Sequence, residues 1–344
     1  MFRFRRLEPA DVPWQTLDRF GDRVVFQTRE WLDFIGESQS ATPVVAEIRD
    51  QDTVAGYFSG LIVRKFGVRI LGSSFPGWTT PYIGFNLAPG YSRARLLDPL
   101  TAWAFRELRC LHVEVSDRCF QQEDGDAARL DRTAYETYKS DLTRSEDDLF
   151  KGMDSACRRC IRKAEKGGVT IEEATDLAFA HEYYEQLKDV FAKQGKVPTY
   201  SLERVELLLK HLLPTGRLLA VRARNPAGKC IATGLYPGMN DTAFFWGNAS
   251  WRDEQHWRPN EYLHWYALRY WKARGVKLFD WGGGGTYKEK YGVVPYAVPW
   301  LYKSKYRFLT TVRDEARSLF YKSQRLIGRL HGVQARPAVA STDS

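Results

Sequence analysis

The sequence is poor in the residues that usually hold metals or disulfides. It has 5 cysteines, 6 histidines and 3 methionines among 344 residues. The cysteines are odd in number and scattered, which excludes a disulfide framework. Cys157 and Cys160 form a single Cys-x-x-Cys spacing inside a basic segment. Because a zinc site of this kind needs a second pair of ligands, we expect no metal.

Long apolar runs are also missing. No segment approaches the ~20 apolar residues that cross a bilayer. The opening residues 1–14, MFRFRRLEPADVPW, are too polar for a signal peptide. These absences predict a cytoplasmic protein, and leave peripheral contact with the inner membrane surface open.

The remaining composition is that of a globular protein with a basic balance. Hydrophobic residues make up 44% and aromatic residues 14% of the chain, so the supply of core side chains is ample. The length suits two domains of ordinary size. The net charge of +9 favours phosphate-bearing partners.

The order of expected elements is the same in both halves. The first half reads strand, helix, three strands, helix, strand, strand; the second reads paired helices, three strands, helix, strand, strand. This order predicts the α/β (α+β) class, with two tandem acetyltransferase-type domains at residues 1–144 and 145–310. Each would be a mixed, mainly antiparallel sheet flanked by helices. Residues 311–332 read as a basic amphipathic helix that covers the core or lies on a membrane, and residues 333–344 as a disordered tail.

Residues 153–169, MDSACRRCIRKAEKGGV, form the most informative stretch. At helical spacing, Met153, Cys157, Cys160, Ile161 and Ala164 share one stripe. The other face carries five cations: Arg158, Arg159, Arg162, Lys163 and Lys166. Like charges so close repel one another unless solvent or an anion lies among them. The face is therefore either solvated or a phosphate-binding surface.

A second stretch combines a strand end with a run of glycines. Asp280 ends an expected strand, and the run at 282–285 includes Gly283 and Gly284. Such glycines allow close backbone approach and can offer amides to an oxyanion, although a flexible turn looks the same. The run is no Walker loop, because the Gly-Lys-Ser/Thr ending is missing.

Three motifs resemble the Fem family of non-ribosomal peptidyltransferases and its acetyltransferase-like (GNAT) relatives. The first is Arg-x-x-Ile-x-Lys-Ala-x-Lys within 153–169, here with Cys160 before Ile161. The second is the stretch 259–283, which ends in Asp-x-Gly-Gly, and the third is Tyr287-Lys-x-x-Tyr-Gly. The likeness covers roughly residues 145–310.

The resemblance implies direct transfer of an acyl or aminoacyl group to an amine, without a covalent enzyme intermediate. It implies aminoacyl-tRNA as donor and a phosphate-bearing cell-wall precursor or peptide-like metabolite as acceptor. The basic helix and Lys288 would then meet phosphates or the tRNA end. The loop 251–260 contains no glycine, and the pyrophosphate of coenzyme A is usually held by glycine-rich backbone, so coenzyme A is disfavoured.

Lys288 is therefore predicted to donate a hydrogen bond to the oxyanion, and His256 to accept the proton of the attacking amine. Each has a simpler reading as a surface side chain. The groups expected to bind substrate are Arg158, Arg159, Arg162, Lys163, Trp78, Tyr82, Trp257, Tyr287, Asp280, Gly283 and Gly284. Two other functions stay open: acyl-coenzyme-A-dependent N-acylation of an amino sugar in polysaccharide biosynthesis, and non-catalytic binding of nucleic acid. No cofactor and no DNA partner is expected.

Overall fold

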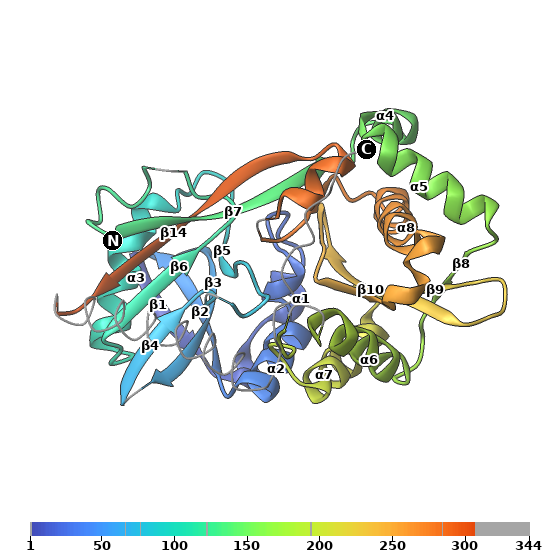
Figure 1. Ribbon diagram of the computed structural model, residues 1–344. Coiled ribbons are helices and arrows are strands. Elements are labelled where there is room, and N and C mark those ends of the chain that lie inside the picture. The colour runs from blue at the N-terminus through green and yellow to red at the C-terminus, as the bar shows by residue number, and fades with distance from the viewer. Residues whose placement is uncertain are drawn as a thin grey trace.

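The computed structural model describes residues 2–65, 67–75, 77–121, 123–192, 195–283 and 285–306. The expected helix at 311–332, the expected tail at 333–344 and Gly284 lie outside these residues. One continuous sheet of 14 strands crosses the molecule (Figure 1), flanked by helices. The first half contributes β1 (Phe2–Leu7), η1 (Pro9–Asp11), α1 (Trp14–Leu17), η2 (Val25–Gln27), α2 (Arg29–Gln39), β2 (Thr42–Asp50), β3 (Thr53–Lys65), β4 (Val68–Gly72), β5 (Gly84–Leu87), α3 (Ala94–Arg106), β6 (His112–Ser116) and β7 (Asp131–Asp141).

The second half repeats this order with longer helices. Its elements are α4 (Glu146–Gly152), α5 (Ser155–Lys166), β8 (Thr170–Glu173), α6 (Phe179–Ala192), α7 (Leu202–Leu212), η3 (Leu213–Thr215), β9 (Leu218–Arg224), β10 (Cys230–Met239), β11 (Thr242–Phe244), β12 (Gly247–Ser250), η4 (Arg252–Trp257), α8 (Pro259–Ala273), β13 (Leu278–Asp280), η5 (Thr286–Tyr291) and β14 (Val294–Ser304). The third of the strands expected before the last helix is divided into β11 and β12, which pair with different parts of β10.

The sheet shows the duplication directly. In the first half, β3 pairs with β4 near its end and with β5 nearer its start, and β4 runs parallel to β6. In the second half, β10 pairs with β11 and β12 in the same way, and β11 runs parallel to β13. The predicted mixed, mainly antiparallel sheet is confirmed, and the duplication is visible in hydrogen bonding although the sequence shows no repeat.

The last strands of the two halves are exchanged. The strand order around them is β6-β14-β7-β13, so β14 completes the sheet of the first half and β7 extends that of the second. Trp300 of β14 pairs with Ser116 of β6, and Asp280 of β13 pairs with Lys139 of β7. The predicted boundary at residue 144 therefore does not divide the sheet.

Three apolar cores hold the layers together. One core lies under α3 in the first half, and a second lies between the sheet and α5 and α8 in the second half. The third core takes side chains from both halves, including those of α2, α6 and α7, and α2 packs against α7 across the boundary (Figure 1). The halves are therefore joined by a shared core as well as by the sheet.

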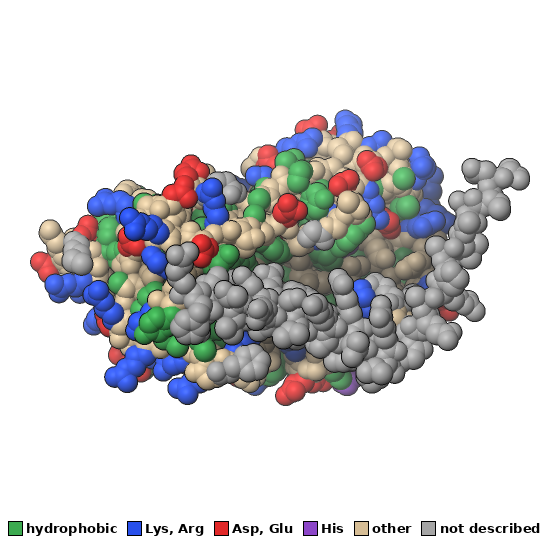
Figure 2. Space-filling model, turned by 60° about the vertical axis from the view of Figure 1, so that its left-hand side comes forward, with side chains coloured by type: hydrophobic (Ala, Val, Ile, Leu, Met, Phe, Trp, Pro, Cys, Tyr) green, Lys and Arg blue, Asp and Glu red, His purple; other side chains and the backbone are tan. Residues whose placement is uncertain are grey.

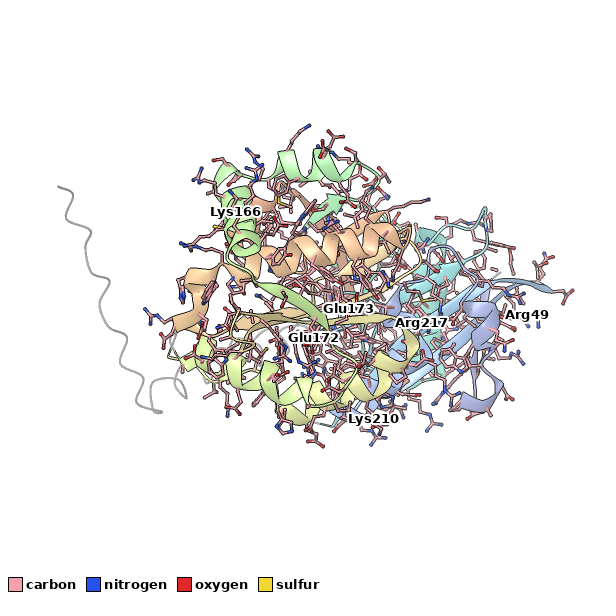
Figure 3. All side chains as sticks on the ribbon, turned by 90° about the vertical axis from the view of Figure 1, so that its right-hand side faces the viewer. Arg49, Lys166, Glu172, Glu173, Lys210 and Arg217 are labelled. Carbon is pink, nitrogen blue, oxygen red and sulfur yellow. The ribbon has the colours of Figure 1, made fainter. Side chains whose placement is uncertain are left out.

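Charge is distributed over the surface rather than gathered in one block. In Figure 2, basic and acidic side chains are interspersed along the upper part of the visible face. The edge strand β8 carries Glu172 and Glu173 (Figure 3), and Glu172 accepts hydrogen bonds from Arg222 and Arg224 of β9. Within the described ranges, no helix combines the length and the apolar character that crossing a bilayer requires.

Candidate functional site at the boundary between the halves

Asp280 is the centre of the boundary between the two halves. It ends β13 and is completely buried. Its Oδ1 accepts hydrogen bonds from Thr137 Oγ1 and Gly282 N, both at 2.8 Å. Its Oδ2 accepts from Tyr82 Oη at 3.1 Å and Tyr296 Oη at 2.5 Å. These donors come from the first half, from β7, from β14 and from the glycine run.

All acceptor positions of Asp280 are therefore occupied. A carboxylate accepts about four hydrogen bonds, and Asp280 already receives four from protein groups. Burial raises the pKa of Asp280, because a charged carboxylate is poorly solvated inside the protein, and the hydrogen bonds oppose this rise. Asp280 and Tyr82 were predicted to contact substrate; both are buried here, and the contact stays a prediction. Asp280 holds the tyrosines and the glycine run in place.

Lys288 holds the glycine run from the opposite side. It is 3% exposed, and its Nζ donates to the carbonyl oxygens of Trp281 (2.8 Å), Gly282 and Gly283 (2.9 Å). An ammonium has three donors, so none is left for a developing oxyanion. In this conformation all three protons of Lys288 are used by the glycine run, and its donation to an oxyanion stays a prediction. Burial lowers the pKa of Lys288 to about 8.

The backbone conformation held by Lys288 requires glycine at positions 282 and 283. Gly282 and Gly283 have φ values of 56° and 57°, a region that favours glycine. With their carbonyls directed at Lys288, the amide of Gly282 donates to Asp280 and that of Gly283 donates to Tyr135 Oη. Burial raises the pKa of Tyr135, so its hydroxyl stays protonated and has its own proton to donate.

His264 is a buried neighbour that sequence reasoning missed. It lies on α8, and its Nδ1 is 3.0 Å from Tyr236 Oη. Its ring contacts those of Phe245 and Trp281. Burial lowers the pKa of His264 to about 3, so it is neutral at physiological pH. The only signal in the sequence was its place on the helix that precedes the Asp280 strand.

Comparison with known proteins identifies the second half. Residues 153–291 match the model of the acetyltransferase (GNAT) domain family. The second half is a GNAT domain. The repeated strand pairing extends this fold to the first half, so the chain has two tandem GNAT-type domains and is an acyltransferase.

Solved structures support the tandem fold. FemX superposes with a TM-score of 0.70 at 12% identity, covering 86% of this chain and 96% of its own. A tandem GNAT protein from the clavulanic acid biosynthesis pathway gives 0.51 at 13% identity, over 89% and 99%. L-PGS from Bacillus licheniformis gives 0.50 at 13% identity, over 89% and 92%. A search of curated proteins finds no match.

The remaining predicted groups of this GNAT protein are only partly brought together. Tyr287 is 53% exposed and lies beside Lys288, whose Nζ is 5.6 Å from the ring centroid. The carbonyl oxygen of Trp78 accepts a hydrogen bond from α7. His256 is exposed on η4, with Nδ1 2.8 Å from Asp253 O, and Trp257 packs against Gly167. Among the described residues, no hydrogen bond or ring contact joins these last two groups to Asp280 or Lys288.

The described contacts of the cations on the basic helix lie within the second half. α5 packs against α8 on the outer side of the GNAT domain, and Lys166 projects from its far end (Figures 1 and 3). Arg158 donates to the carbonyl oxygens of Lys151 and Met153, and Arg162 lies over the Phe150 ring at 5.2 Å. Arg159 and Lys163 are exposed. Among the described residues, no hydrogen bond, ion pair or ring contact joins these four side chains to the first half, and the prediction that they border a groove between the halves stays a prediction. The buried stripe of Cys157, Ile161 and Ala164 is confirmed.

The described residues also contain no group of three His, Cys, Asp or Glu side chains that could hold a metal ion. The cysteines are free, and burial raises the pKa of Cys157 to about 12. A buried thiol of this kind is a poor nucleophile. The chemistry must therefore be sought in the glycine run and the tyrosines around it.

Proposed function

We propose that this GNAT protein transfers an aminoacyl group from aminoacyl-tRNA to an amine of a peptidoglycan precursor or a peptide-like metabolite. The observation that carries the proposal is the tandem fold, which agrees with that of FemX over 86% of the chain. The net charge of +9 is compatible with an RNA donor and a phosphate-bearing acceptor. We place the reaction in the cytoplasm, where charged tRNA is found.

The loop before α8 supports tRNA over coenzyme A. In this loop the amides of Glu254 and Arg258 donate to backbone oxygens within η4, and that of Arg252 donates to Asp189. Pro259 begins α8 and has no amide proton. Few amides are therefore free to surround a pyrophosphate at this helix terminus.

The reaction needs no covalent enzyme intermediate. The neutral amine of the acceptor attacks the ester carbonyl, a C–N bond forms, and the C–O bond to the ribose breaks. The proton lost by the amine ends on the departing ribose oxygen. Lys288 and Asp280 fix the glycine run from both sides, and the Tyr135 hydroxyl beside Gly283 has a free proton for the reacting oxygens. Such fixed donors are worth ~2–4 kcal/mol each in the transition state.

The test is transfer of label from tRNA charged with radioactive amino acids. Acceptors would be a diphosphate-carrying cell-wall precursor peptide and a panel of free peptides. We expect label to move to an acceptor amine, and Tyr135→Phe to lower the rate constant about 10²-fold while leaving the exposed control variant His256→Gln close to the parent. Loss of activity in His256→Gln with none in Tyr135→Phe would contradict the assignment.

One observation favours a second function, N-acylation of an amino sugar with an acyl-coenzyme A. The matching family is named for acetyl transfer. Transfer from radioactive acetyl-coenzyme A to amino sugars, with none from charged tRNA, would support this function and replace the first. The same GNAT match disfavours a non-catalytic RNA-binding protein.

A further inference from the structure

The exchanged strand β14 presents its two faces to different surroundings. Leu301 packs into the core under α3. Because successive side chains of a strand alternate between the two faces of a sheet, Trp300, Tyr302 and Ser304 lie on the opposite face. This face continues, further back along the strand, into the core that both halves share.

Side chains of β6 lie on the same face and contact those of β14 (Figure 1). His112 is the register partner of Ser304, and its Nδ1 is 2.7 Å from Ser304 Oγ. Glu114 is the register partner of Tyr302 and lies 3.2 Å from His112 Nε2. The Glu114 carboxylate also accepts a hydrogen bond from Trp300 Nε1 at 3.0 Å. We call these five side chains the β6–β14 face.

The burial of this face is not explained by the helices that the structure describes. His112, Glu114 and Trp300 are only 3%, 5% and 6% exposed. In the described part of the chain, α3 packs on the other face of β6, and α2 packs against β2 and α7. Trp300 belongs to none of the three apolar cores that the described residues form. Since a buried sheet face needs a second layer over it, we looked to the rest of the chain for that layer.

The chain leaves the described residues beside the β6–β14 face. β14 ends at Ser304, and Lys305 N donates to the carbonyl oxygen of Leu111, which precedes His112. The link from Tyr306 to residue 311 spans at most ~18 Å, so the segment 311–332 must begin near this end of β14. A helix over 311–332 would be ~33 Å long, about the length of an 11-residue strand such as β14.

The charges of the face and of the segment 311–332 are complementary. Glu114 lies on the face, and Asp131 of β7 is the register partner of Tyr302 at its rim. The segment carries five cations, which are Arg313, Arg317, Lys322, Arg325 and Arg329. At helical spacing its apolar stripe consists of Ala316, Leu319, Phe320, Leu326, Ile327 and Leu330.

We propose that residues 311–332 dock as a helix on the β6–β14 face of the same chain. The apolar stripe packs on Trp300 and Tyr302, and the flanking cations pair with Glu114 and Asp131. The docked helix holds β14 in the sheet of the first half. Because Tyr296 of β14 donates to Asp280, the same contact supports the glycine-run site. The docking does not depend on which donor or acceptor the enzyme uses.

The first test is photo-cross-linking in the full-length protein. The photoreactive residue p-benzoylphenylalanine replaces Tyr302, and mass spectrometry maps the peptide to which it is joined. We expect cross-links to residues 311–332 within one molecule, at the mass of a monomer. The control places the same residue at position 303, because Lys303 Nζ donates to Ala128 O on the other face of the sheet. This control should give no cross-link to residues 311–332.

The second test compares two neighbouring aromatic residues of the segment by thermal unfolding. Phe320 belongs to the apolar stripe, whereas Tyr321 lies about 100° further round a helix and outside the stripe. Phe320→Asp should lower the Tm by about 2–4 °C, as expected for losing the burial of one aromatic side chain in a chain of this length. Tyr321→Asp should lower the Tm by less than about 1 °C.

The proposal requires both results. A cross-link from position 302 that joins two molecules, no cross-link to residues 311–332, or equal Tm values for the two aspartate variants would overturn it. If the protein with p-benzoylphenylalanine at position 302 does not fold, as judged by circular dichroism, the Tm comparison decides alone. Sedimentation with phosphatidylglycerol vesicles that is lost in Phe320→Asp, combined with no cross-link, would assign the stripe to a membrane surface instead.

Discussion

Replacing Tyr82 by phenylalanine removes one hydroxyl from the Asp280 cluster and nothing else. Tyr82 is fully buried, and its hydroxyl donates to Asp280 Oδ2 at 3.1 Å across 198 residues of sequence. Loss of a hydrogen bond to a charged group costs ~1.5–3 kcal/mol. For a chain of 344 residues, this corresponds to a fall of about 2–4 °C in Tm.

The assay is urea denaturation followed by circular dichroism, with Tyr57→Phe as the control. Tyr57 is also buried, but its hydroxyl makes no hydrogen bond among the described residues, so we expect its loss to cost under ~0.5 kcal/mol. The double variant Tyr82→Phe/Tyr296→Phe should deviate from additivity, because both hydroxyls donate to the same oxygen. If Tyr82→Phe were no more destabilising than Tyr57→Phe, Asp280 would not join the halves as we describe.

Three further predictions concern pH, strand exchange and close packing. The pKa of His264 is lowered to about 3, so below pH ~6.5 the unfolded chain binds a proton at this residue that the folded chain does not. The free energy of unfolding should therefore fall as the pH is lowered. Urea denaturation from pH 7 to 4 should show that His264→Gln reduces the dependence of this free energy on pH by about 1.4 kcal/mol per pH unit. A fragment of residues 1–144 lacks β14 and the α7 side of the shared core, and should aggregate in size-exclusion chromatography. A stable monomeric fragment would contradict the strand exchange. In Gly247→Ala the new Cβ would lie 2.4 Å from Tyr183 Oη, costing ~1–3 kcal/mol, and Tyr183→Phe should recover part of this loss in the double variant.

Local pattern was sufficient for much of the fold. The α5 stripe follows from helical periodicity, and the structure buries the residues that the period selects. The glycine run after β13 predicts a turn with positive φ, because glycine has no Cβ to oppose it, and Gly282 and Gly283 adopt this conformation. The place of the site at the end of β13 could be predicted for the same reason.

The roles of individual site residues could not be predicted. Lys288 looked like a free donor, but three carbonyl oxygens use all of its protons. The cations of α5 were expected to line a groove, but the described contacts of Arg158 and Arg162 are with residues 150–153. Whether a polar group is free for substrate depends on which partners reach it, and these partners are distant in sequence.

The sequence by itself determined the class of fold and the turn around which the site forms, because periodicity and glycine conformation act over a few residues. Only the tertiary structure decided that β7 and β14 are exchanged, that Asp280 is saturated by donors from both halves, and that Arg204 is buried without an ion pair among the described residues. These features depend on contacts between residues more than a hundred positions apart, and on the exclusion of water from the space between them.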